Sequence, residues 1–130
     1  MFDYGGVIDR FPDDIALLIM DMRRKGIVVG LISNVSLDLA RTTRQSGGYT
    51  QFDITVLSGE VGLRKPDIDM YRLALNQLDN TPPHDVLVID DNPANLAVAT
   101  TLGVQTVCFR NINSIATIRM AAELHSRADI

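Results

Sequence analysis

The sequence predicts an α/β fold in which a central parallel sheet is covered by helices on both faces. Short apolar runs rich in branched residues alternate along the chain with longer segments of helical periodicity. Such near-continuous apolar runs are typical of strands buried on both faces. Alternating strands and helices give right-handed crossovers and a three-layer sandwich. We expect residues 1–130 to form one domain, because that length buries one hydrophobic core.

The strands are expected where branched apolar residues gather. One strand should end at Asp3, and the others are IVVGLI (27–32), ITVL (54–57), VLVI (86–89) and VQTVCF (104–109). Only two residues precede Asp3, so the first strand is short and should leave part of its neighbours unpaired. Such a short strand is expected if the chain lacks residues upstream or if it is a natural truncation. A natural truncation would in turn indicate a degenerate enzyme.

Charges and caps delimit the helices. The segment 13–26 begins with acidic residues, carries Arg-Arg-Lys in its last turn and stops at Gly26, as the helix dipole and a glycine C-cap require. Asn92 and Pro93 are a typical helix start, and Gly103 a typical end. Helices are therefore expected around 13–26, 37–45, 66–78, 92–103 and 114–124.

Composition excludes several classes of protein. Hydrophobic residues make up 46% and charged residues 22%, and no apolar run reaches the roughly 18–20 residues of a membrane helix. A net charge of −4 with no basic cluster beyond RRK (23–25) argues against nucleic-acid binding. Cys108 is the one cysteine and the N-terminus does not resemble a signal peptide, so a cytoplasmic location is expected.

Polar residues follow the expected strands at their carboxyl ends, where ligands bind in open α/β sheets. They come from separate parts of the sequence and are Asp3, Ser33, Asn34, Arg64, Lys65, Asp90 and Asp91. Clustered carboxylates form a hard-oxygen site for Mg²⁺, which can neutralise phosphoryl oxygens. A carboxylate can attack phosphorus, while a hydroxyl and an ammonium group stabilise the transferring oxygens. The set therefore suits phosphate chemistry.

Four segments carry a resemblance to a known family. FDYGGVI, LISN, LSGEVGLRKPD and VLVIDDNPANLAVATTLGVQTV occur in order over almost the whole chain. Together they resemble the motifs of haloacid dehalogenase-like (HAD) hydrolases, in phrasing close to the small-molecule phosphatases and the phosphatase-like domain of epoxide hydrolases. The resemblance implies a Rossmann-like three-layer α/β sandwich, Mg²⁺ as cofactor and phosphomonoester hydrolysis through an aspartyl phosphate.

The resemblance also implies roles for individual residues. Asp3 would be the nucleophile and Lys65 would steady it, while Ser33, with Asn34 beside it, would bind the phosphoryl group. Mg²⁺ would be held by Asp3, the backbone carbonyl of Gly5, Asp90 and Asp91. Simpler explanations stay open for each side chain: a turn aspartate, a helix cap for Ser33, a solvated lysine, and for Asp91 a charge at a helix N-terminus.

The sequence departs from the phosphatase pattern at position 5. Gly5 stands where these phosphatases carry a second aspartate that acts as general acid and base. Such help is worth roughly 10²–10⁴ in rate, so turnover should be weakened but not abolished. Tyr4 lies one residue before the position at which true dehalogenases carry tyrosine, which makes carbon–halogen cleavage the weaker expectation.

The space between the first two motifs is the second departure. Only GGVIDRFP separates the first motif from the first helix, which leaves no room for the helical cap domain of many relatives. An open site favours a macromolecular substrate or an oligomer that covers its own rim. The expected partner is a small phosphorylated metabolite or a phosphorylated macromolecule, and a homodimer is a further expectation. The alternative function is a catalytically impaired module that binds phosphate or a protein partner.

Overall fold

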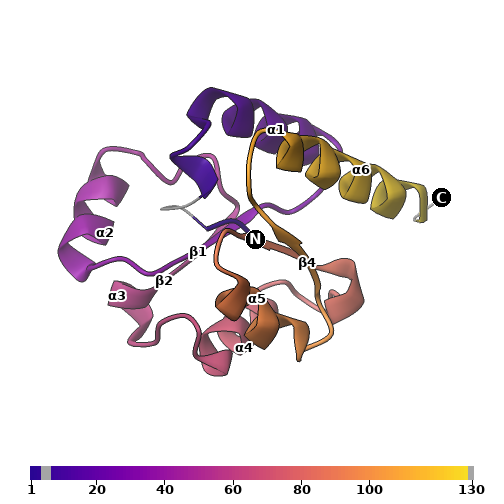
Figure 1. Ribbon diagram of the computed structural model, residues 1–130. Coiled ribbons are helices and arrows are strands. Elements are labelled where there is room, and N and C mark those ends of the chain that lie inside the picture. Colours follow the sequence, from indigo (N-terminus) through magenta and orange to yellow (C-terminus); the bar gives the residue numbers. More distant parts are fainter. Residues whose placement is uncertain (4–6, 129–130) are drawn as a thin grey trace.

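The computed structural model describes residues 1–3 and 7–128 and shows helices packed around short parallel strands (Figure 1). The elements in chain order are α1 (Pro12–Arg24), β1 (Gly30–Ser33), α2 (Leu37–Gln45), β2 (Ile54–Leu57), α3 (Ser58–Val61), α4 (Ile68–Asn76), η2 (Pro83–Asp85), β3 (Leu87–Asp90), α5 (Pro93–Thr100), β4 (Gln105–Cys108) and α6 (Asn113–Ala128). The expected strands and helices are all present; α3 and the 3-10 turn η2 were not expected.

The strands form two parallel pairs that the N-terminal residues join. β1 pairs with β2 and β3 pairs with β4, both in parallel. Phe2 lies between the pairs and forms parallel bridges with Leu31 and Ile89. The order across the sheet is therefore β2, β1, residues 1–3, β3 and β4. All carboxyl ends consequently meet at one edge, as the sequence predicts.

The short first strand does not leave its neighbours unpaired, so that expectation was wrong. Phe2 donates its N–H to Gly30 and accepts from Ile32, at 2.8 and 2.9 Å, while the amine of Met1 lies 2.8 Å from the carbonyl oxygen of Leu87. Asp3 in turn donates its N–H to Ile89. β1 and β3 are themselves only four residues long, so a three-residue segment suffices to join them.

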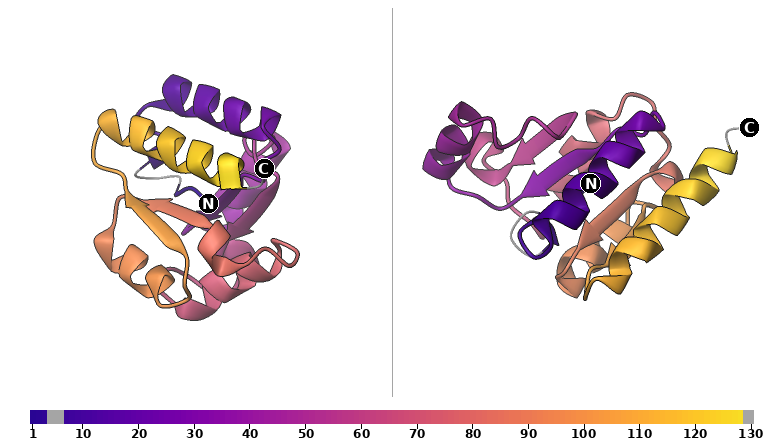
Figure 2. Two further views of the ribbon diagram at one scale, coloured as in Figure 1. Left: turned by 90° about the vertical axis from the view of Figure 1, so that its right-hand side faces the viewer. Right: turned by 90° about the horizontal axis from the view of Figure 1, so that it is seen from above.

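Helices cover both faces of the sheet (Figure 2). α1 and α6 lie together on one face, where Leu18 and Ile118 are fully buried. α4 and α5 lie on the other face and bury Met70 and Ala99 against the sheet. Burying both faces of the strands explains why the apolar runs are nearly continuous. The structure thus confirms the three-layer α/β sandwich.

Local signals set most helix ends. The Ser36 hydroxyl accepts the N–H of Leu39 at the start of α2, and the Asn92 side chain accepts the N–H of Ala94 at the start of α5. Gly26 ends α1 with a positive φ of 82°, which favours glycine. The expected helix 66–78 is shorter, because the Asp67 side chain caps α4 one residue before Ile68.

Within the described residues, α1 is the only α-helix between Asp3 and β1, so no cap domain is inserted there. Each described helix is too short or too polar to cross a lipid bilayer.

Candidate active site

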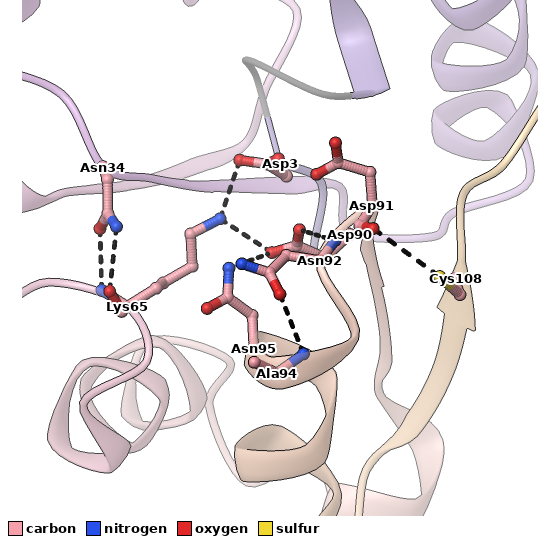
Figure 3. A network of polar contacts seen from close by, with 9 residues as sticks. All are labelled: Asp3, Asn34, Lys65, Asp90, Asp91, Asn92, Ala94, Asn95 and Cys108. Atoms are coloured by element: carbon pink, nitrogen blue, oxygen red, sulfur yellow. Dashed lines mark hydrogen bonds and ion pairs between the residues drawn. The ribbon is translucent and has the colours of Figure 1, made fainter.

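The carboxyl edge of the sheet brings together residues that are far apart in the sequence (Figure 3). Asp3 ends the central segment, Asp90 ends β3 and Asp91 follows it. Lys65 reaches them from the segment between α3 and α4. This is the grouping of acids and ammonium that the strand ends predict.

Lys65 is the central cation of the site. Its Nζ atom lies 2.8 Å from Oδ1 of Asp3 and 3.0 Å from Oδ2 of Asp90. Only 4% of Lys65 is exposed, so it is not a solvated surface lysine. A buried charge is tolerated only when paired and hydrogen-bonded, and here one ammonium serves two carboxylates. The pairing fixes where the Asp3 carboxylate points.

Asp90 is held in its ionised form by its neighbours. Besides Lys65, Oδ1 accepts the N–H of Asn92 at 2.9 Å and Oδ2 accepts from the Asn95 amide at 3.1 Å. Burial by itself raises the pKa of Asp90, but the charge of Lys65 and these hydrogen bonds outweigh it and lower the pKa below its ordinary value. Asp90 is therefore an anion with a fixed orientation.

Asp91 experiences the opposite effect. Partial desolvation of its carboxyl raises the pKa of Asp91, and the adjacent carboxylates of Asp90 and Asp3 raise it further. The side chain is nevertheless exposed, and Lys65 contacts the other two acids rather than this one. Asp91 is thus the acid that would gain most from a bound cation.

The three aspartates fit a magnesium ion. One carboxylate oxygen from each of Asp3, Asp90 and Asp91 lies within 4.8 Å of the others. Oxygens on opposite sides of an octahedral Mg²⁺ are about 4 Å apart, since each bond is about 2 Å long. The all-oxygen donor set and the raised pKa of Asp91 agree with a hard divalent cation.

Ser33 and Asn34 follow each other at the end of β1 but differ in their surroundings. Ser33 is 6% exposed, and its hydroxyl has no hydrogen-bond partner among the described residues. Asn34 has a partner for each polar atom: Nδ2 donates to the Lys65 carbonyl at 3.0 Å, and Oδ1 accepts the Lys65 N–H at 2.8 Å. Ser36, not Ser33, caps α2, which leaves the Ser33 hydroxyl available.

Gly5, expected to offer a backbone carbonyl to the metal, and Tyr4 lie outside the described residues. Sequence reasoning also missed a residue beneath the site. Tyr71 of α4 is 3% exposed, and its hydroxyl has no partner among the described residues. Burial, together with the charges of Asp90 and Asp3, raises the pKa of Tyr71 well above its ordinary value.

The chain is thus an α/β protein with three clustered aspartates and a buried lysine at the carboxyl edge of a parallel sheet. Such an acidic cluster is of the kind that can hold a metal ion. The family model for haloacid dehalogenase-like hydrolases matches residues 6–103. The chain therefore belongs to the haloacid dehalogenase-like hydrolases, as its four motifs indicate.

Known relatives and structures agree with this family. The chain is 33% identical over 84 residues to a phosphoserine phosphatase of Thermus thermophilus, an alignment that covers 64% of this chain and 33% of the phosphatase. A HAD family enzyme variant from Bacteroides thetaiotaomicron, in complex with magnesium and inorganic phosphate, has a TM-score of 0.61 and 25% identity, covering 76% of this chain and 53% of that one.

An uncharacterised protein from Corynebacterium glutamicum has the same fold over nearly its whole length. The TM-score is 0.81 at 23% identity, and the alignment covers 94% of this chain and 92% of that one. By contrast, the chain spans only about a third of the length of the Thermus phosphatase.

Proposed function

We propose that this chain is a Mg²⁺-dependent phosphomonoester phosphatase that works through an aspartyl-phosphate intermediate on Asp3. The observation that carries the proposal is the position of the Lys65 ammonium between Asp3 and Asp90, with Asp91 beside them. The phosphatase among the relatives and the magnesium–phosphate complex among the structural neighbours support it. A small phosphorylated metabolite or a phosphorylated macromolecule is the proposed substrate.

Asp3 is the proposed nucleophile. Lys65 holds Oδ1 of Asp3, which leaves the other carboxylate oxygen to attack phosphorus. A bond forms between that oxygen and phosphorus while the ester P–O bond breaks, and the leaving alkoxide takes a proton from solvent. Water then attacks the acyl phosphate and restores the carboxylate, releasing inorganic phosphate. Lys65 offsets the negative charge that collects when carboxylate and phosphate meet.

Asp3, Asp90 and Asp91 are proposed to hold the cation, with the backbone carbonyl of Gly5 as a further ligand. Mg²⁺, when bound, would neutralise phosphoryl oxygens. Asn92 and Asn95 keep Asp90 oriented toward that position. The Ser33 hydroxyl is proposed to donate to a phosphoryl oxygen, because it sits at the same edge with no other partner among the described residues.

Glycine at position 5 should make the rate depend on the leaving group. Without a carboxylic acid there, the leaving oxygen has no side-chain proton donor at that position. Aryl phosphates should therefore be hydrolysed faster than alkyl phosphates. Solvent then has to supply that proton.

The proposal is tested by hydrolysis of p-nitrophenyl phosphate with and without Mg²⁺, comparing the wild type with Asp3→Asn. We expect metal-dependent turnover that falls by at least about 10³-fold in Asp3→Asn. The matched control is Asp9→Asn, which changes an exposed aspartate six residues further on and should leave turnover unchanged.

The same assay separates the two functions that the sequence leaves open. A folded wild type without turnover contradicts the phosphatase proposal. Retained binding of inorganic phosphate in that inactive protein would favour a binding module instead.

A further inference from the structure

Two loops from neighbouring strands are joined beside the site. The loop after β1 carries Ser33 and Asn34, and the segment between α3 and α4 carries Lys65. The Asn34 carboxamide bridges them with two hydrogen bonds to the backbone of Lys65, one given and one received, at 3.0 and 2.8 Å (Figure 3). The amide therefore clamps the residue whose ammonium binds Asp3 and Asp90.

A second contact joins the loop after β1 to α3, the short helix that precedes the Lys65 segment. The Ser58 hydroxyl accepts the N–H of Val35 at 2.7 Å and lies 3.0 Å from its carbonyl oxygen. Gly59 approaches the same loop so closely that a Cβ there would lie 2.6 Å from the carbonyl carbon of Ser36. The backbone of α3 thus packs on the backbone of the loop after β1. The stretch from Ser58 to Lys65 is therefore held to that loop at both ends, by Ser58 at one and by the Asn34 clamp at the other.

We propose that Asn34 is a positioning residue that fixes the backbone of Lys65 and, through it, the ammonium between Asp3 and Asp90. The inference deepens the phosphatase proposal and rests on it for its kinetic consequence. A flexible lysine stem transmits position only if its backbone is fixed. Two hydrogen bonds to one peptide backbone restrict both its place and its rotation.

This role differs from phosphoryl binding by Asn34, which the family resemblance suggested. A residue that binds the phosphoryl group contacts the substrate directly, whereas a positioning residue acts only through Lys65. Asn34 is itself exposed, so Asn34→Ala removes the two hydrogen bonds without opening a cavity in the core. The matched control is Ser36→Ala, which removes the α2 cap from the same loop and touches neither atom of the clamp.

Lysine labelling provides a readout that does not need catalysis. The sequence contains two lysines, Lys65 in the site and Lys25, which is exposed and serves as an internal reference. An amine-acylating reagent followed by peptide mass spectrometry gives the ratio of the two labelling rates. We expect that ratio to rise about tenfold in Asn34→Ala. It should stay within about twofold of wild type in Ser36→Ala.

Kinetics then test whether Asn34 acts through Lys65. For p-nitrophenyl phosphate with Mg²⁺ we expect Asn34→Ala to lower kcat about tenfold or more, with KM nearly unchanged. In a Lys65→Ala background the same change should have no further effect, because the group being positioned is gone. Asn34→Asp keeps the acceptor for the Lys65 N–H and should give an intermediate labelling ratio.

Three results would overturn the inference. The first is a labelling ratio in folded Asn34→Ala that equals that of the wild type, and the second is a ratio in Ser36→Ala that rises as much as in Asn34→Ala. The third is a loss of kcat on adding Asn34→Ala to Lys65→Ala that is as large as its loss in the wild type. An inactive wild type would contradict the proposed function alone. The labelling ratio would then still decide whether Asn34 positions Lys65.

Discussion

The Nζ atom of Lys65 lies 2.8 Å from Oδ1 of Asp3, although 62 residues separate the two along the chain. The same nitrogen lies 3.0 Å from Oδ2 of Asp90. One ammonium therefore joins the ends of two segments of the sheet. Its removal would leave buried negative charge without a counter-ion, and stability and metal binding should both report this.

Lys65→Met should destabilise the metal-free protein by about 3 kcal/mol, because breaking a buried ion pair leaves an uncompensated charge. Urea unfolding measures the change. Mg²⁺ should restore part of the loss, since the cation takes over the compensation. Lys25→Met is the control and should stay within about 0.5 kcal/mol of wild type, because Lys25 is exposed. Equal stability of the two variants would mean that the ammonium contributes nothing to folding.

Asp91→Asn should raise the melting temperature of the metal-free protein near neutral pH and remove its stabilisation by Mg²⁺. The fold raises the pKa of Asp91 above its usual 3.8, so the folded chain binds the proton more tightly than the unfolded chain. Ionised Asp91 therefore costs stability at pH values above its folded pKa, and that cost disappears as the pH falls through it. Thermal unfolding with and without Mg²⁺ tests both statements.

Asp90 should show the opposite pH dependence. Its pKa lies below 3.8 in the fold, so its contribution to stability is complete above 3.8 and is lost as the pH falls through the lower folded value. Asp90→Asn should destabilise the chain at neutral pH and flatten the acid limb of a stability profile measured from about pH 2 to 7. An unchanged acid limb would mean that other carboxylates dominate it.

Tyr71→Phe should stabilise the protein by about 1 kcal/mol, because it removes a buried hydroxyl with no partner among the described residues. The ring, which packs against the sheet, is retained. Chemical denaturation measures the difference. Tyr49→Phe is a control at another buried tyrosine, one whose hydroxyl is not stranded in this way. A loss of stability in Tyr71→Phe would reveal a hydrogen-bond partner such as a buried water.

Gly59→Ala has two opposing effects on stability, one from helix propensity and one from tertiary packing. Gly59 lies within the helix α3, where alanine is favoured over glycine by about 1 kcal/mol. A Cβ there would nevertheless lie 2.7 Å from the Val35 carbonyl oxygen, and backbone cannot yield as a side chain can. We expect a net destabilisation of about 2 kcal/mol or more by urea unfolding. A stabilised variant would show that the two loops separate easily.

Regular elements were predictable where the signal is local. The run 54–57 became β2 with the same bounds, and Asn92 caps α5 as its sequence neighbours indicate. The expected strand 27–32 became Gly30–Ser33, because the Asp53 side chain takes the N–H of Val29. That contact joins residues 24 positions apart, so the local pattern of apolar residues cannot reveal it.

The sequence by itself determined the α/β class, the family and the strand ends at which Asp3 and Asp90 lie, since hydrophobic periodicity and motif order are properties of neighbouring residues. The tertiary structure alone decided that Phe2 joins the two strand pairs and that Asn34 clamps Lys65. Those contacts join residues about 30 or more positions apart. Their partners are chosen by packing of the whole chain, which no local propensity encodes.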